Sequence, residues 1–152
     1  MKLTAVTLYI VFLIFITGLG VGGATEKQLL IKAALPMSAL LILALRLLGP
    51  NKEQIGWAAF TGWLGMTYLQ TGGPIEVLAF FVCVALGALG IFRSSYFLVV
   101  AWLGHIVWDF LPRELPENLH DLPLACTLFD GLIGLYLLWG SITKRWTPFF
   151  RT

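Results

Sequence analysis

Ionisable side chains crowd into one stretch of an otherwise apolar chain, residues 104–131. Within it His105 and Asp109 are four positions apart, and Cys126 and Asp130 repeat that spacing. Residues at i and i+4 share one face of a helix, so each pair presents two reactive groups on the same side. An imidazole beside carboxylates suits general acid–base catalysis or nitrogen and oxygen ligation of a divalent metal ion.

The helices that carry these pairs are predicted to end near residue 111 and to begin near residue 122. Both rise about 1.5 Å per residue, so His105 and Asp130 are expected at matched depth, roughly 9–12 Å from the helix ends. Helices joined by a short loop are antiparallel neighbours, so the two side chains are expected to face each other. An ionisable residue inside a membrane is by default a hypothesis of function.

Two versions of the site follow from these residue types. In the catalytic version, Asp130 donates a proton, His105 acts as base or orienting group, and Asp109 fixes the imidazole tautomer. In the metal version, a divalent ion is bound by His105, Asp109, His120 and Asp130. Three further residues are predicted as accessory members of the site: Glu76, Trp108 and Cys126.

Each candidate also has a structural interpretation. His105 can be a core histidine satisfied by a neighbouring hydrogen bond. Asp109 can be solvated or paired with Arg113 at i+4, and Glu76 can stabilise a helix N-terminus through the helix dipole. For Asp130 the structural interpretation is weakest, because its own helix carries no basic residue within reach.

The composition of the chain indicates whether these residues lie in water or in a membrane. The chain has 152 residues, of which 59% are hydrophobic and 12% charged. Soluble domains normally carry roughly 25% charged residues, so this chain is predicted to be an integral membrane protein. A net charge of +2 gives no argument for nucleic acid as a partner. Cys83 and Cys126 lie in apolar runs without CxxC spacing, which predicts buried free thiols.

Six segments approach the length of about 20 apolar residues that a membrane span needs. They are residues 3–23, 29–48, 55–69, 75–92, 96–111 and 122–142. Backbone polar groups must be satisfied inside lipid, so these spans are predicted to be helices. The fold class expected is an all-α integral membrane protein, a single domain over residues 1–152 built as a bundle of about six transmembrane helices. The first span is expected to be retained, since its apolar core exceeds the usual 7–15 residues of a signal peptide.

The distribution of Lys and Arg predicts an N-in/C-in orientation, by the excess of positive charge in cytoplasmic loops. The cytoplasmic side then collects Lys2, Arg46, Lys52, Arg93, Lys144, Arg145 and Arg151. The other side receives Lys27, Lys32 and Arg113. This orientation places the polar site near the outer leaflet of the cell (inner) membrane.

The pattern W-L-x-H-x-x-W-D, followed on the next apolar run by C-x-x-x-D, resembles an uncharacterised bacterial family of small polytopic membrane proteins. The matching residues are Trp102, Leu103, His105, Trp108, Asp109, Cys126 and Asp130. In that family further histidines follow the Trp-Asp pair, whereas this chain continues with Phe110, Leu111 and Pro112. The resemblance covers the last third of the chain and implies candidate positions without a mechanism.

Three classes of function remain open on the sequence. The first is an intramembrane enzyme that acts on a lipid-like or isoprenoid substrate by acid–base or metal-assisted chemistry. The second is a proton- or cation-linked carrier, and the third an accessory subunit whose polar residues hold helices together. Serine-hydrolase, zincin, Walker and dinucleotide motifs are all absent from the sequence. Expected partners are the bilayer, a lipid-like ligand, and a second copy or another membrane subunit.

Overall fold

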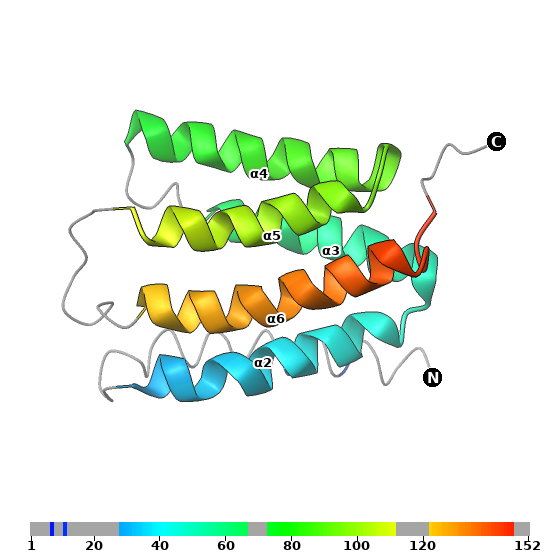
Figure 1. Ribbon diagram of the computed structural model, residues 1–152, viewed down its shortest axis with the longest axis horizontal. Helices are drawn as coiled ribbons and strands as arrows, with labels where there is room; N and C mark the ends of the chain where they lie inside the picture. The colour runs from blue at the N-terminus through cyan, green and yellow to red at the C-terminus, as the bar shows by residue number, and fades with distance from the viewer. Residues whose placement is uncertain (1–6, 8–10, 12–27, 67–72, 112–121, 148–152) are drawn as a thin grey trace. The chain divides into compact units, whose positions relative to one another are not determined.

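The computed structural model describes residues 28–66, 73–111 and 122–147, together with Thr7 and Val11. These residues form five helices: α2 (Leu29–Arg46), α3 (Pro50–Gly65), α4 (Pro74–Phe92), α5 (Tyr96–Asp109) and α6 (Leu122–Ile142) (Figure 1). No strand occurs in the described ranges, so the all-helical class is confirmed there. The span predicted at residues 3–23 lies outside the described residues except for Thr7 and Val11.

Three of these helices are long and apolar enough to cross a membrane: α2, α4 and residues Pro123–Ile142 of α6. This indicates a membrane protein. Helix α5 is apolar but has only 14 residues, and α3 has 16 and begins with the polar run Asn51–Gln54. The count of six spans and the N-in/C-in orientation therefore stay predictions.

Proline and glycine mark where two of the helices begin. Gly49 has φ +83° and ψ 161°, a positive-φ conformation that costs glycine little, and Pro50 follows as the first residue of α3. Pro74 opens α4 in the same way. The missing N–H of proline is harmless at this position and its fixed φ suits a helix. Consequently α3 begins at residue 50, earlier than the predicted span at 55–69.

The chain divides into two compact units. Unit 1 comprises residues 1–48 and 103–133, and unit 2 comprises residues 49–102 and 134–152. Unit 1 thus contains α2, the second half of α5 and the first half of α6. Unit 2 contains α3, α4 and the remaining halves of α5 and α6.

Within unit 2, small residues let α3 and α4 pack closely. A Cβ atom added to Gly87 would lie 3.0 Å from the Ala58 carbonyl oxygen, and one added to Gly65 would lie 3.1 Å from Cys83 Cβ. Such close approach is typical of helices that associate in lipid, where small residues line the interface.

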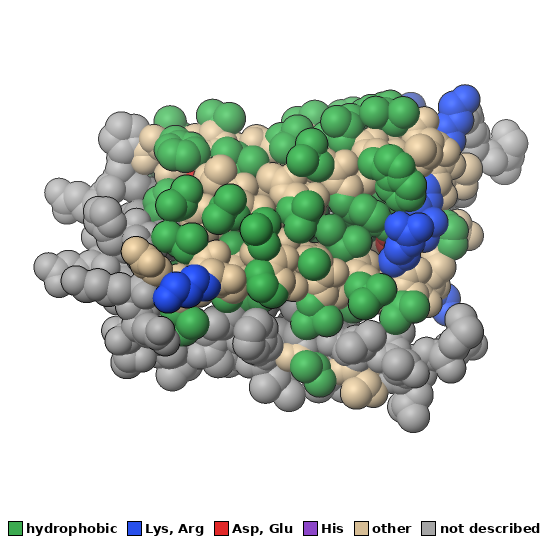
Figure 2. All heavy atoms as spheres, turned by 60° about the horizontal axis from the view of Figure 1, so that its bottom comes forward, with side chains coloured by type: hydrophobic (Ala, Val, Ile, Leu, Met, Phe, Trp, Pro, Cys, Tyr) green, Lys and Arg blue, Asp and Glu red, His purple; other side chains and the backbone are tan. Residues whose placement is uncertain are grey.

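The exposed faces of the helices are apolar. In α4 the buried residues are the small Cys83, Gly87 and Gly90, whereas large side chains such as Leu78 and Phe81 are exposed. A helix from a soluble protein buries its large apolar residues, so this reversed distribution fits a lipid environment. Figure 2 shows hydrophobic side chains exposed across the face in view.

Candidate functional site

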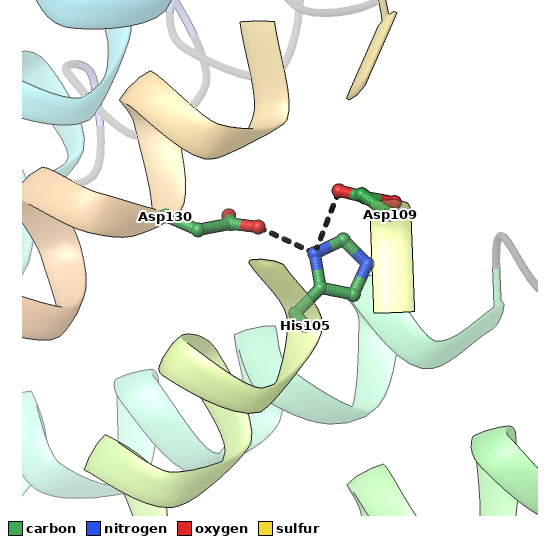
Figure 3. Close-up of side chains that lie close together, drawn as sticks. All are labelled: His105, Asp109 and Asp130. Atoms are coloured by element: carbon green, nitrogen blue, oxygen red, sulfur yellow. Dashed lines mark hydrogen bonds and ion pairs between the residues drawn. The ribbon is translucent and has the colours of Figure 1, made fainter. Parts of the chain in front are cut away.

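His105, Asp109 and Asp130, here called the triad, converge within unit 1. His105 and Asp109 lie one turn apart near the end of α5, and Asp130 lies in α6. All three side chains are almost completely buried, with exposed fractions of 4%, 3% and 1%. The i, i+4 spacing places the first two on one face of α5, and Figure 3 shows both carboxylates turned toward the same ring nitrogen.

His105 Nδ1 is the centre of the triad. It forms a close hydrogen bond with Asp130 Oδ2. Asp109 Oδ2 lies 3.5 Å from the same nitrogen. The structure therefore brings together the three residues that both versions of the predicted site share.

The hydrogen bonding of the carboxylate oxygens in the triad indicates what the site could bind. Asp130 Oδ1 is buried and has no hydrogen-bond partner among the described residues. A buried acceptor left unpaired costs about 1–3 kcal/mol, and more when it is charged. The two carboxylates also approach one nitrogen from different helices. A cation beside Asp130 Oδ1 would compensate this unpaired acceptor.

The triad has the composition and spacing of a metal site. One nitrogen of His105 and one oxygen of each aspartate lie within 4.8 Å of one another. A divalent ion bound by two carboxylates and an uncharged imidazole is electrically neutral, which suits a buried position. This mixed nitrogen and oxygen donor set is typical of zinc and of manganese or iron. Three protein ligands leave at least one coordination position open.

The other predicted members of the site do not belong to the triad. His120 falls outside the described residues. Glu76 lies in the first turn of α4 in unit 2, where its carboxylate covers Gly73: a Cβ atom added there would meet Glu76 Oε2 at 2.1 Å. A carboxylate at a helix N-terminus is favoured by the helix dipole. Trp108 and Cys126 belong to unit 1, and both are half-buried.

Unit 2 contains a buried polar cluster that the sequence analysis missed. Glu53 is 0% exposed. Tyr136 donates its hydroxyl hydrogen to Oε1, while Arg145 approaches Oε2 with Nε at 2.9 Å and Nη2 at 2.8 Å. The hydrogen bond to Glu53 raises the pKa of Arg145 above its ordinary value, so the guanidinium stays charged. Both carboxylate oxygens are satisfied, which gives this cluster a structural role.

Hydrogen bonds and aromatic rings complete the interior around that cluster. Gln54 Nε2 donates to the Gly90 carbonyl oxygen at 2.8 Å. Trp102 Nε1 donates to Thr61 Oγ1 at 3.0 Å, and the Trp102 ring packs edge-on against Trp57 with centroids 6.0 Å apart. Glu53, Gln54 and Trp102 in unit 2 are thus paired with specific neighbours. Trp57 Nε1 and Trp146 Nε1, like Asp130 Oδ1 in the triad, are buried and have no hydrogen-bond partner among the described residues.

The fold and the triad together define a helical protein with three candidate membrane helices and a buried His-Asp-Asp group. The sequence pattern of DUF6010, a family of unknown function, matches residues 27–143. The chain therefore belongs to this family, and the match includes every helix from α2 to α6 and the whole triad. This agrees with the resemblance to an uncharacterised family. Neither the curated proteins nor the solved structures contain a significant match to the chain.

Proposed function

We propose that this chain is a multi-pass membrane protein whose triad binds a divalent metal ion and uses it to act on a lipid-like substrate. The observation that carries the proposal is the convergence of three buried ligand atoms, one from each residue of the triad, within 4.8 Å. If the contact were purely structural, one carboxylate beside the imidazole of His105 would be enough. Here a second carboxylate is buried beside the same nitrogen, and the first retains an oxygen without a partner among the described residues.

A metal held by His105, Asp109 and Asp130 would act as a Lewis acid that polarises an oxygen atom of the substrate. The protein residues supply orientation: α5 holds His105 and Asp109 one turn apart, and α6 presents Asp130 opposite them.

The position of the triad along its helices supports a substrate drawn from the bilayer. Asp109 is the last residue of α5, so at about 1.5 Å per residue His105 lies roughly 6 Å from the helix end. On other faces of α5 the side chains of Val107 and Phe110 are 68% and 64% exposed, and such apolar exposure on a membrane protein fits contact with acyl chains. With the predicted orientation, the site lies toward the non-cytoplasmic side of the inner membrane.

The test is the metal content of the detergent-purified full chain, measured by mass spectrometry. We expect about one divalent ion per chain in the wild type and loss of at least nine-tenths of it in His105→Ala and Asp130→Asn, since each substitution removes one of three ligands. Glu76→Gln is the matched control, because it removes a carboxylate outside the triad and should retain the metal.

Two outcomes would contradict the proposal. A metal-free wild type that remains metal-free after incubation with zinc, manganese or iron would favour the structural interpretation of the triad. Metal that persists in both triad variants would show that it binds elsewhere in the chain. Size-exclusion profiles of each variant establish that a loss of metal is not a loss of folding.

A further inference from the structure

The helices that hold the triad contain no positive charge. Residues 96–111 and 122–142, which cover α5 and α6, include neither Lys nor Arg. The third described helix of unit 1 is α2, and both of its basic residues, Lys32 and Arg46, are exposed. The described surroundings of the triad therefore offer no buried cation that could compensate an additional negative charge.

The proposed metal complex is itself neutral. Two aspartate carboxylates balance a divalent ion, and the imidazole adds no charge. An anionic ligand in the open coordination position, such as a phosphate or a carboxylate, would give the buried complex a net negative charge. Burying an uncompensated charge is strongly unfavourable, whereas an uncharged oxygen ligand leaves the complex neutral.

We propose that the open position at the triad accepts an uncharged oxygen, the hydroxyl of a lipid alcohol or the carbonyl of a lipid ester, and discriminates against anionic headgroups. This inference rests on the proposed function and names the substrate class of that site. The same helix, α5, also exposes the apolar side chains Val107 and Phe110, which suit contact with the hydrocarbon portion of such a molecule.

The experiment compares four probes that share one dodecyl tail and differ in headgroup. The full chain is loaded with Co²⁺ in an uncharged detergent, and the visible absorption of the ion reports ligands that enter its coordination sphere. Dodecanol and methyl dodecanoate are the uncharged probes, and they separate hydroxyl from ester recognition. Dodecanoate and dodecyl phosphate are the anionic probes. We expect at least one uncharged probe to bind at concentrations about tenfold below those of both anions.

A charge variant tests the cause of that preference. Asp109→His retains three metal ligands but removes one negative charge, so the divalent complex becomes a cation. We expect the affinity ratio of dodecyl phosphate to dodecanol to rise at least about tenfold in this variant relative to the wild type, because the anion now neutralises the complex.

The possible results separate the two proposals. If the wild type binds Co²⁺ no better than His105→Ala does, the proposed metal site is wrong. The proposed substrate class is then wrong as well, because it depends on the metal. If the wild type binds Co²⁺ and the anionic probes bind as tightly as the uncharged ones, the metal site stands and the substrate class is wrong. An unchanged probe ratio in a Co²⁺-loaded Asp109→His protein would equally overturn the charge argument.

Discussion

At the scale of single residues, Glu53 shows how strongly this fold depends on pairing one buried carboxylate. Arg145 is only partly buried, with a side-chain exposure of 21%, while Glu53 is fully buried. Breaking a buried ion pair by removing one partner costs about 3–5 kcal/mol, because the remaining charge is uncompensated. Solvent screening at Arg145 reduces this, so we expect Arg145→Met to lower the free energy of unfolding by about 2 kcal/mol.

The double variant Glu53→Gln/Arg145→Met should be more stable than the sum of the two single variants predicts, since it leaves no unpaired buried charge. Thermal or SDS-induced unfolding of the four proteins in detergent measures this coupling. Additive effects of the two substitutions would show that the contact contributes nothing to stability.

Glu53 also shows which contacts of the interior could not be predicted from the sequence. The triad could be predicted because its information is local: an i, i+4 pair on one helix and an aspartate at similar depth on the next. Glu53 is separated from Tyr136 by 83 positions and from Arg145 by 92. Its contacts exist only once the helices have packed, and a carboxylate in the first turn of a helix is an ordinary surface feature in sequence.

At the scale of elements, the close packing of α3 against α4 depends on Gly87. A Cβ atom there would approach the Ala58 backbone, which cannot rotate out of the way. We expect Gly87→Leu to separate the two helices and to destabilise the protein by about 1–3 kcal/mol through overpacking. Ala85→Leu is the matched control, because Ala85 is exposed on the same helix and a larger apolar residue there meets lipid. Thermal unfolding distinguishes the two variants, and equal stability would refute a packing role for Gly87.

Helix boundaries could be predicted where hydrophobicity alone defines them. The predicted spans at 29–48, 75–92 and 122–142 correspond closely to α2, α4 and α6, each a long apolar run with a turn signal at one end. Helix α3 begins at Pro50, five residues before the span predicted at 55–69. Hydropathy excluded the polar run Asn51–Gln54, whereas Gly49 and Pro50 begin the helix before it. The start of α3 is therefore determined by the Gly-Pro turn and not by the hydrophobic pattern.

At the scale of the whole molecule, metal binding to the triad and stability of the fold are thermodynamically linked. The ligands come from two helices, so the complete site exists only in the folded chain. A ligand that binds the folded state alone adds about 2.7 kcal/mol at a hundredfold excess over its Kd. For a chain of this size that corresponds to a change in Tm of about 5–10 °C. We therefore expect a chelator to lower the Tm of the wild type by that amount.

The variants separate this linkage from a general effect of the chelator. Glu76→Gln retains the triad and should show the same decrease in Tm as the wild type. His105→Ala should melt at one temperature with or without the chelator, because it has no metal to lose. Equal decreases in all three proteins would mean that the chelator acts outside the triad. A decrease confined to proteins with an intact triad would show that one buried group, contributed by α5 and α6, both binds the ion and stabilises the folded membrane protein.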